Sequence, residues 1–228
     1  MNEDFSGYLN KISSGKKLIL IGEIHGTKEI PTLLNDFFSE YIKENDFDIH
    51  LELSSDEQSK INAFLESGDE IFLRNTFFNI ADNDGRRTLE YLELIKKIFV
   101  LNKKHNKAIR IFCVDVADSI NINSENLQNE REKIIADNIL KNTTKKTFVI
   151  LGSVHVANKI INISGIKIIP SGYYLYKKIK DAVNINLVPK KGKFINVSLK
   201  QVDSSLKDFN QYYDYIYYLD CVSPATIL

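Results

Sequence analysis

Several kinds of residue and segment are scarce in this chain, and each scarcity excludes a class of protein. Of its 228 residues, two are cysteine, one is methionine and none is tryptophan. Cys113 and Cys221 lie far apart, so they form neither a disulfide framework nor a Cys-x-x-Cys motif. Apolar runs such as 18–21 are too short to cross a bilayer, and segment 1–17 has no signal-peptide core. We therefore expect a reduced, soluble, cytoplasmic protein without a membrane partner.

The chain also lacks a net charge, because 30 basic residues balance 30 acidic ones. A protein that binds duplex nucleic acid needs a surplus of Lys and Arg to displace counterions, so we expect no nucleic-acid partner. Hydrophobic residues make up 43% and charged residues 26%, which is typical of a globular protein and excludes intrinsic disorder as the main state.

What the chain does contain is a series of short apolar runs, each followed by a loop and a helix-like segment. Strands covered on both faces are predicted at 17–22, 47–53, 109–116 and 147–152. Amphipathic helices are predicted at 31–42, 56–67, 87–105 and 129–140. This alternation predicts parallel βαβ units.

The last third of the chain has a different pattern. Segments 183–188 and 194–199 flank the turn 189–193 and look like a β-hairpin, and 215–219 is a final apolar strand. No linker rich in Gly, Ser or Pro interrupts the chain. The sequence therefore predicts one α/β domain over residues 1–228. It has a central, mostly parallel sheet with flanking helices, and the C-terminal β-hairpin and final strand are added to the same domain.

Two of the predicted strands end in the same way, with four apolar residues, a glycine, two more residues and a histidine. The first copy contains Gly22 and His25, and the second contains Gly152 and His155. Ligands bind beyond the carboxyl ends of the strands in an open parallel sheet, so both histidines are expected at that edge. Acidic residues are expected at the same edge: Glu23, Glu52 and Asp115.

Imidazoles and carboxylates at one edge suit two kinds of chemistry, and the sequence leaves both open. One is a divalent metal, such as zinc, manganese or cobalt, that lowers the pKa of a bound water. The candidate ligands are His25, Glu52, His155 and Glu23. The other is a metal-free general base with a carboxylate that fixes its tautomer. A single histidine after a strand is more often structural, but two matching copies beside acids favour a functional site.

A cation from the predicted helix 129–140 is expected to join this edge. Arg131 lies one turn before Ile135 on the same stripe, so both should face the protein. A half-buried guanidinium needs carboxylate partners or an anionic ligand. The sequence fits equally an ion pair with Glu23 or Asp115 and a role in ligand binding.

These residues resemble the superfamily that groups erythromycin-esterase-like proteins, ChaN-like haem-binding proteins and Tiki/TraB metalloproteases. Segment 22–26 is similar to its Gly-Glu-x-His signature, and segment 152–155 to its second Gly-x-x-His. Segment 131–138 is similar to the Arg-Asp-x-x-Met-Ala-x-Asn helix of the esterase-like branch, with Glu132 in place of Asp. The resemblance extends over about 17–226. It implies an α/β fold and a pocket lined by Glu23, His25, Glu52, Arg131 and His155.

The function that the resemblance and the residues favour is hydrolysis of an ester or an amide (peptide) bond in a small molecule or peptide. In this reading, His25 or His155 activates water, and Arg131 stabilises the developing oxyanion. Glu23 and Glu52 orient the base or bind the metal. The chain is short for a macrolide esterase, so we do not expect a macrolide substrate.

Two alternatives belong to other classes of function. One is a protein that binds haem or another ligand without catalysis, in the manner of ChaN, with haem as the cofactor. The other is a non-catalytic relative that joins a larger assembly through the tyrosine-rich segment 212–218. The sequence determines neither the oligomeric state nor whether any cofactor is needed.

Overall fold

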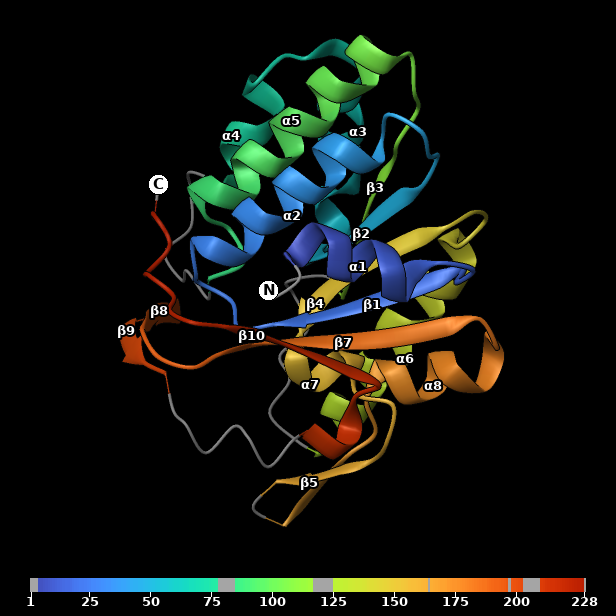
Figure 1. Ribbon diagram of the computed structural model, residues 1–228, viewed down its shortest axis with the longest axis vertical. Coiled ribbons are helices and arrows are strands. Elements are labelled where there is room, and N and C mark those ends of the chain that lie inside the picture. Colours follow the sequence, from blue (N-terminus) through green and yellow to red (C-terminus); the bar gives the residue numbers. More distant parts are fainter. Residues whose placement is uncertain are drawn as a thin grey trace.

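A parallel sheet forms the centre of the molecule (Figure 1). The computed structural model describes residues 4–77, 85–116, 125–163, 165–196, 198–202 and 210–227. The sheet has six strands in the order β10-β7-β1-β4-β2-β3, and every neighbouring pair is parallel. Its strands are β1 (Leu18–Glu23), β2 (Asp48–Ser54), β3 (Ile111–Asp115), β4 (Thr147–Gly152), β7 (Ala182–Pro189) and β10 (Tyr215–Leu219).

Helices cover both faces of the sheet, so the inner strands have no exposed side (Figure 1). One face carries α1 (Phe5–Ser13), α2 (Glu29–Tyr41), α3 (Gln58–Ser67) after a short 3-10 turn (Ser55–Glu57), α4 (Ile71–Phe77) and α5 (Leu89–His105). The other face carries α6 (Glu125–Asn142), α7 (Ser153–Val156) and α8 (Ser171–Lys178). Every residue of β1, β2 and β7 is buried, which explains the continuous apolar run at the start of β1.

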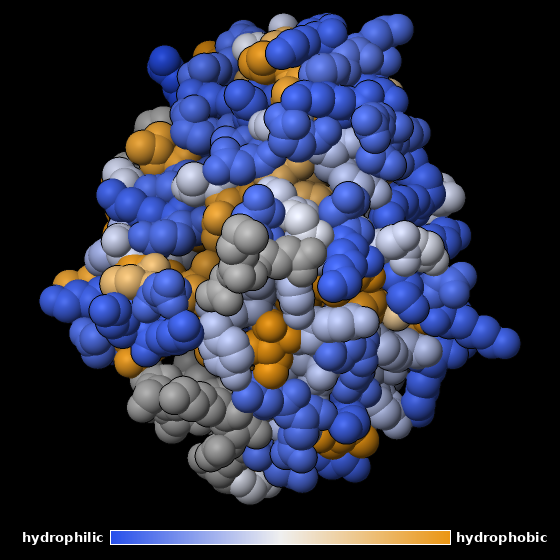
Figure 2. Space-filling model, viewed as in Figure 1, coloured by the Kyte–Doolittle hydropathy of each residue, from blue (hydrophilic) through white to orange (hydrophobic). Residues whose placement is uncertain are grey.

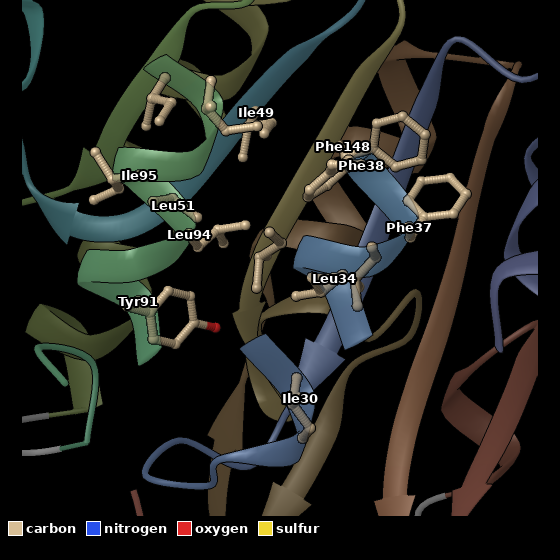
Figure 3. Close-up of a cluster of buried hydrophobic side chains, with 14 of the residues drawn as sticks. Ile30, Leu34, Phe37, Phe38, Ile49, Leu51, Tyr91, Leu94, Ile95 and Phe148 are labelled. Carbon is tan, nitrogen blue, oxygen red and sulfur yellow. The ribbon is translucent and has the colours of Figure 1, made fainter. Parts of the chain in front are cut away.

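The two faces of the sheet have separate hydrophobic cores. Ile19 and Ile21 of β1 pack into the larger core beneath α2 and α5, whereas Leu18 and Leu20 pack into the smaller one beneath α6. Aromatic rings fill part of the larger core, where Phe148 of β4 makes edge contacts with the following rings: Phe37, Phe38, Tyr41 and Phe47. Figure 3 shows the row of side chains from α2 that faces the sheet. β1 and β4 run in register from Leu18 and Thr147 to Glu23 and Gly152, so both strands end at the same edge of the sheet.

The predicted fold class is confirmed, including the C-terminal β-hairpin, but the strands of that hairpin are not the expected ones. The hairpin pairs β8 (Lys193–Asn196) with β9 (Ser198–Gln201). The expected pairing of 183–188 with 194–199 is wrong, because β7 lies inside the sheet, parallel to β1 and β10. The alternation of Asn184 and Asn186 with apolar residues is typical of a half-exposed strand, yet both amides are buried.

The remaining predicted elements occur within a few residues of their expected bounds. The largest difference is α6, which begins at Glu125 rather than at 129. A second, smaller hairpin joins β5 (Ile161–Ile163) to β6 (Ile166–Ile168). Over the described residues, the structure has no helix of the length and apolarity that a bilayer span requires. Figure 2 shows a largely hydrophilic face on which hydrophobic residues form only small patches.

Candidate active site

The carboxyl edge of the sheet brings the candidate residues of both histidine motifs together. Glu23 is the last residue of β1, and Asp115 is the last residue of β3. Glu52 lies near the end of β2, and His155 lies in α7, directly after β4. A cavity of about 530 Å³ opens here and is lined by Glu23, His25, Glu52 and His155, among others. The two histidine motifs therefore contribute to one site.

His25 is held between two carboxylates. Its Nδ1 lies 2.7 Å from Glu23 Oε1, and its Nε2 lies 3.2 Å from Glu52 Oε2. The hydroxyl of Tyr91, on α5, donates to the same Glu23 oxygen. These contacts fix the plane of the imidazole ring and direct both of its nitrogens at acids.

His155 is held in a similar way from the other side. Its Nδ1 lies 2.8 Å from Glu132 Oε1, and its Nε2 lies 3.3 Å from Glu52 Oε1. Glu132 is itself fixed, because Ser171 donates its backbone N–H to Glu132 Oε2 over 2.9 Å. Glu52 therefore stands between the two imidazoles, with one carboxylate oxygen directed at each.

Both motif glycines are required by close approach of neighbouring groups. A Cβ on Gly152 would lie 3.0 Å from His25 Nε2, and the Gly152 N–H donates to Glu52 Oε2 over 2.7 Å. A Cβ on Gly22 would lie 2.6 Å from Val156 Cγ2 and 2.9 Å from Asn186 Oδ1. The repeated Gly-x-x-His pattern thus has a steric cause in both copies.

Arg131 forms an ion pair, which is one of the two roles that the sequence left open for it. Its Nε and Nη2 donate to the two oxygens of Asp115 over 2.8 and 2.6 Å, and Nη2 also donates to Glu52 Oε1 over 2.9 Å. Its remaining nitrogen, Nη1, lies 3.3 Å from His155 Nε2. Arg86 provides a second cation, with Nη1 at 2.5 Å from Asp115 Oδ2. The partner is thus Asp115 rather than Glu23.

The charges around the imidazoles favour their protonated forms. Burial lowers the pKa of His25, but the charge of Glu52 and the hydrogen bonds to Glu23 and Glu52 outweigh it and raise the pKa to about 10. Burial likewise lowers the pKa of His155, and Glu132 and Glu52 together raise it to about 10. The two imidazoles in turn hold the pKa of Glu52 well below its ordinary value, although burial opposes them. At neutral pH both imidazoles are therefore protonated.

The arrangement does not fit the metal centre that was one sequence hypothesis. Among the described residues, no three or more His, Cys, Asp or Glu side chains are grouped so that they could hold a metal ion. The guanidinium of Arg131 lies against Glu52 and directs Nη1 at His155 Nε2, where a second cation would be repelled. The residues of this site therefore do not fit a bound metal ion.

The rest of the cavity combines an apolar wall with a few polar groups. The apolar side chains are Ile24, Val154, Leu187, Val188 and Phe194. The polar ones are Ser153, Asn186 and Tyr213. Ser153 Oγ donates to Asn186 Oδ1 over 2.6 Å, and the Tyr213 hydroxyl donates to the backbone oxygen of Ser153 over 2.9 Å.

Sequence reasoning missed several of these residues. Tyr91, Asn186 and Tyr213 lie in no motif, and only the tertiary packing brings them to the site. Glu132 follows Arg131 directly and occupies the acidic position of the motif. That position was the sequence signal that could have identified Glu132 as a site residue.

Comparisons with known proteins relate the chain to solved structures but not to sequences. No family model matches it, and no curated protein sequence matches it. A succinoglycan biosynthesis protein superposes with a TM-score of 0.74 at 12% identity, over 100% of this chain and 94% of that chain. A mutant of erythromycin esterase EreC in its open conformation gives a TM-score of 0.64 at 11% identity, over 87% of this chain and 79% of that chain.

A haem-binding protein shares the architecture as well. ChaN of Campylobacter jejuni, in a structure of cofacial haem binding, superposes with a TM-score of 0.51 at 16% identity, over 87% of this chain and 92% of that chain. Identities this low establish a common fold and no common activity. The chain therefore has the α/β fold shared by erythromycin esterase EreC and ChaN. This is the fold that the resemblance of its motifs implied.

Proposed function

We propose that the protein hydrolyses an ester or amide bond in a neutral small molecule. The observation that carries this proposal is the pair of imidazoles, His25 and His155, which line one cavity and are joined through Glu52. Hydrolysis needs a base that takes a proton from water and an acid that gives one to the leaving group. Two histidines on one cavity can supply both.

The roles in this proposal follow from the contacts of each residue. One imidazole accepts a proton from the attacking water after losing its own, which its raised pKa of about 10 places at alkaline pH, while the other, still protonated, donates to the leaving group. Glu23 and Glu52 orient His25, and Glu52 also orients His155. Arg131 donates to Glu52 through Nη2 and so holds Glu52 in place.

The apolar wall of the cavity suggests the kind of molecule that it accepts. Ile24, Val154 and Phe194 are partly exposed on the cavity and give the non-reacting part of a substrate a surface free of charge. Glu23 and Glu52 are balanced by the protonated His25 and His155, so the cavity has no surplus charge that would attract a charged substrate. The substrate is therefore better matched by a neutral ester or amide with an apolar portion than by an acidic peptide.

Turnover of a substrate panel tests the proposal. The wild type is compared with His25→Ala, His155→Ala and the double variant on p-nitrophenyl esters, anilides and fluorogenic peptides, with and without EDTA. Each single variant should lose about 10²–10⁴-fold in kcat/KM for any ester that the wild type cleaves. His105→Ala, at the end of α5, is the matched control and should behave as wild type. Wild-type turnover no greater than that of the double variant contradicts the proposal, and metal content of the purified protein is measured in parallel.

The second candidate is a protein that binds haem or a similar flat ligand without catalysis. Its support is that histidines and a tyrosine, Tyr213, lie on a cavity with apolar walls. Titration of the purified protein with hemin tests it. A shifted Soret band at one equivalent, lost in His25→Ala or His155→Ala, would favour this candidate, and an unshifted band would exclude haem.

A further inference from the structure

Asn186 is a buried polar residue on the cavity wall that the proposed chemistry leaves without a role. It lies on β7, opposite Gly22 of β1 and Ile216 of β10 in the sheet register. The cavity that Asn186 lines is the one that holds His25 and His155. A buried side-chain amide needs hydrogen-bond partners, so the partners of its two polar atoms indicate its function.

The orientation of the Asn186 amide follows from its contact with Ser153. Ser153 Oγ lies 2.6 Å from the amide oxygen. That separation is normal for an O–H···O hydrogen bond and short for an N–H···O one, so the serine hydroxyl donates and the oxygen accepts. The other contact of Ser153 Oγ, with the backbone oxygen of Glu23, is longer at 3.1 Å. The Asn186 oxygen is thus engaged, and Nδ2 is the polar atom that remains.

Asn184, two residues earlier on the same strand, shows what a purely structural amide does here. Its Nδ2 donates to the backbone oxygens of Val156 and Tyr212 over 2.8 and 3.1 Å. Its oxygen accepts the backbone N–H of Asp214 over 2.7 Å. In contrast, no described residue accepts a hydrogen bond from Asn186 Nδ2, although the side chain borders the cavity.

The geometry points to Asn186 Nδ2 as the donor that binds the carbonyl oxygen of the substrate, with Ser153 as the residue that positions it. The choice of a carbonyl rests on the proposed function. Val154, next to Ser153, and Phe194 line the same cavity and are partly exposed, so the apolar part of a ligand lies beside its carbonyl group. An amide N–H matches a neutral carbonyl because it satisfies the oxygen without adding charge beside Glu23 and Glu52.

Side-chain amide spectra test this inference without any need for turnover. The probes are acetophenone and ethylbenzene, which differ only in the carbonyl group. In ¹⁵N-labelled protein, acetophenone should shift the Asn186 NH₂ resonances, which are identified by their absence from Asn186→Asp. Ethylbenzene should not shift them, and the Asn184 resonances serve as an internal control. An acetophenone complex that leaves the Asn186 resonances in place, or no binding of acetophenone at all, overturns the inference.

The variants separate binding through the amide from general effects on the fold. Asn186→Asp should weaken acetophenone about tenfold and leave ethylbenzene unchanged. Ser153→Ala should move the Asn186 resonances of the free protein and reduce their response to acetophenone, and Ser153→Thr should restore both. Equal acetophenone affinity in Asn186→Asp and wild type overturns the inference. If Asn186→Asp does not fold, the comparison of the two probes on the wild type still decides.

Activity data distinguish this inference from the proposed function. For an ester that the wild type hydrolyses, Asn186→Asp should lower kcat/KM by about 10²–10³-fold. Binding of acetophenone through Asn186 without any ester turnover supports the inference and removes the hydrolase proposal. Ester turnover that is unchanged in Asn186→Asp supports the hydrolase proposal and overturns the inference about Asn186.

Discussion

Replacing Arg131 by methionine removes the cation that two buried carboxylates share, and we expect a large loss of stability. The guanidinium makes three hydrogen bonds to acids, at 2.8 and 2.6 Å to Asp115 and at 2.9 Å to Glu52. Breaking a buried ion pair from one side costs about 3–5 kcal/mol, because a charge is left without compensation. Arg86 still pairs with Asp115 in the variant, so the lower end of this range is expected, about 3 kcal/mol at pH 7.5.

Urea denaturation followed by circular dichroism measures this loss in the free energy of unfolding. For a chain of this length, a loss of that size lowers Tm by about 6–12 °C. Lys133→Met is the matched control on the same helix, because Lys133 and its partner Asp137 are both exposed. Removing that surface pair should cost less than about 1 kcal/mol.

The dependence of the Arg131→Met effect on pH gives a second check. Without the guanidinium, the pKa of Glu52 in the folded variant is less strongly lowered than in folded wild type, so the folded variant binds more protons than folded wild type at acidic pH. Its stability relative to wild type should therefore recover as the pH falls through the acidic range in which Glu52 takes up its proton. A loss below 1 kcal/mol at pH 7.5, or a loss that does not change with pH, would refute the idea that Arg131 neutralises this pair.

Three further changes test other parts of the site. Glu132→Gln removes the first of the charges that raise the pKa of His155 to about 10. If His155 is the base, kcat/KM of this variant should reach its plateau at a lower pH than kcat/KM of wild type. An unchanged pH profile argues against His155 as the base. His50 is buried with neither ring nitrogen bonded, and burial lowers its pKa to about 3. Because the unfolded chain takes up this proton from about pH 6.5 downward, the free energy of unfolding of wild type falls as the pH falls. His50→Phe should unfold at a higher urea concentration, and its free energy of unfolding should change less between about pH 6.5 and 4. Gly152→Ala should displace the His25 ring and lower kcat/KM at least about tenfold while the circular dichroism spectrum is retained.

The parallel core of the fold could be predicted because its signals are local. The run 18–21 alternates between two buried faces, so it carries no polar residue, and such runs identify strands without knowledge of their neighbours. The position of β7 was harder to predict. Asn184 satisfies its amide with backbone groups from distant segments, which no local pattern reveals.

The site could be predicted only as far as the strand ends define it. His25 follows β1 closely and Glu52 lies near the end of β2, so sheet topology alone places them at one edge. Tyr91 reaches Glu23 from the first turn of α5, and its position depends on how that helix packs over the sheet. The pairing of Arg131 with Asp115 depended on side-chain directions that spacing does not specify.

The shared carboxylate of Glu52 means that the two histidines do not release their protons independently. When both are charged, each imidazolium competes for the same acid and repels the other. Loss of the first proton ends this competition, so the second proton is held more tightly and the pair titrates in two separated steps. Between those steps the site holds one proton for two rings, and it then contains one acid and one base at the same time. Removing either histidine should accordingly raise the pKa of the one that remains.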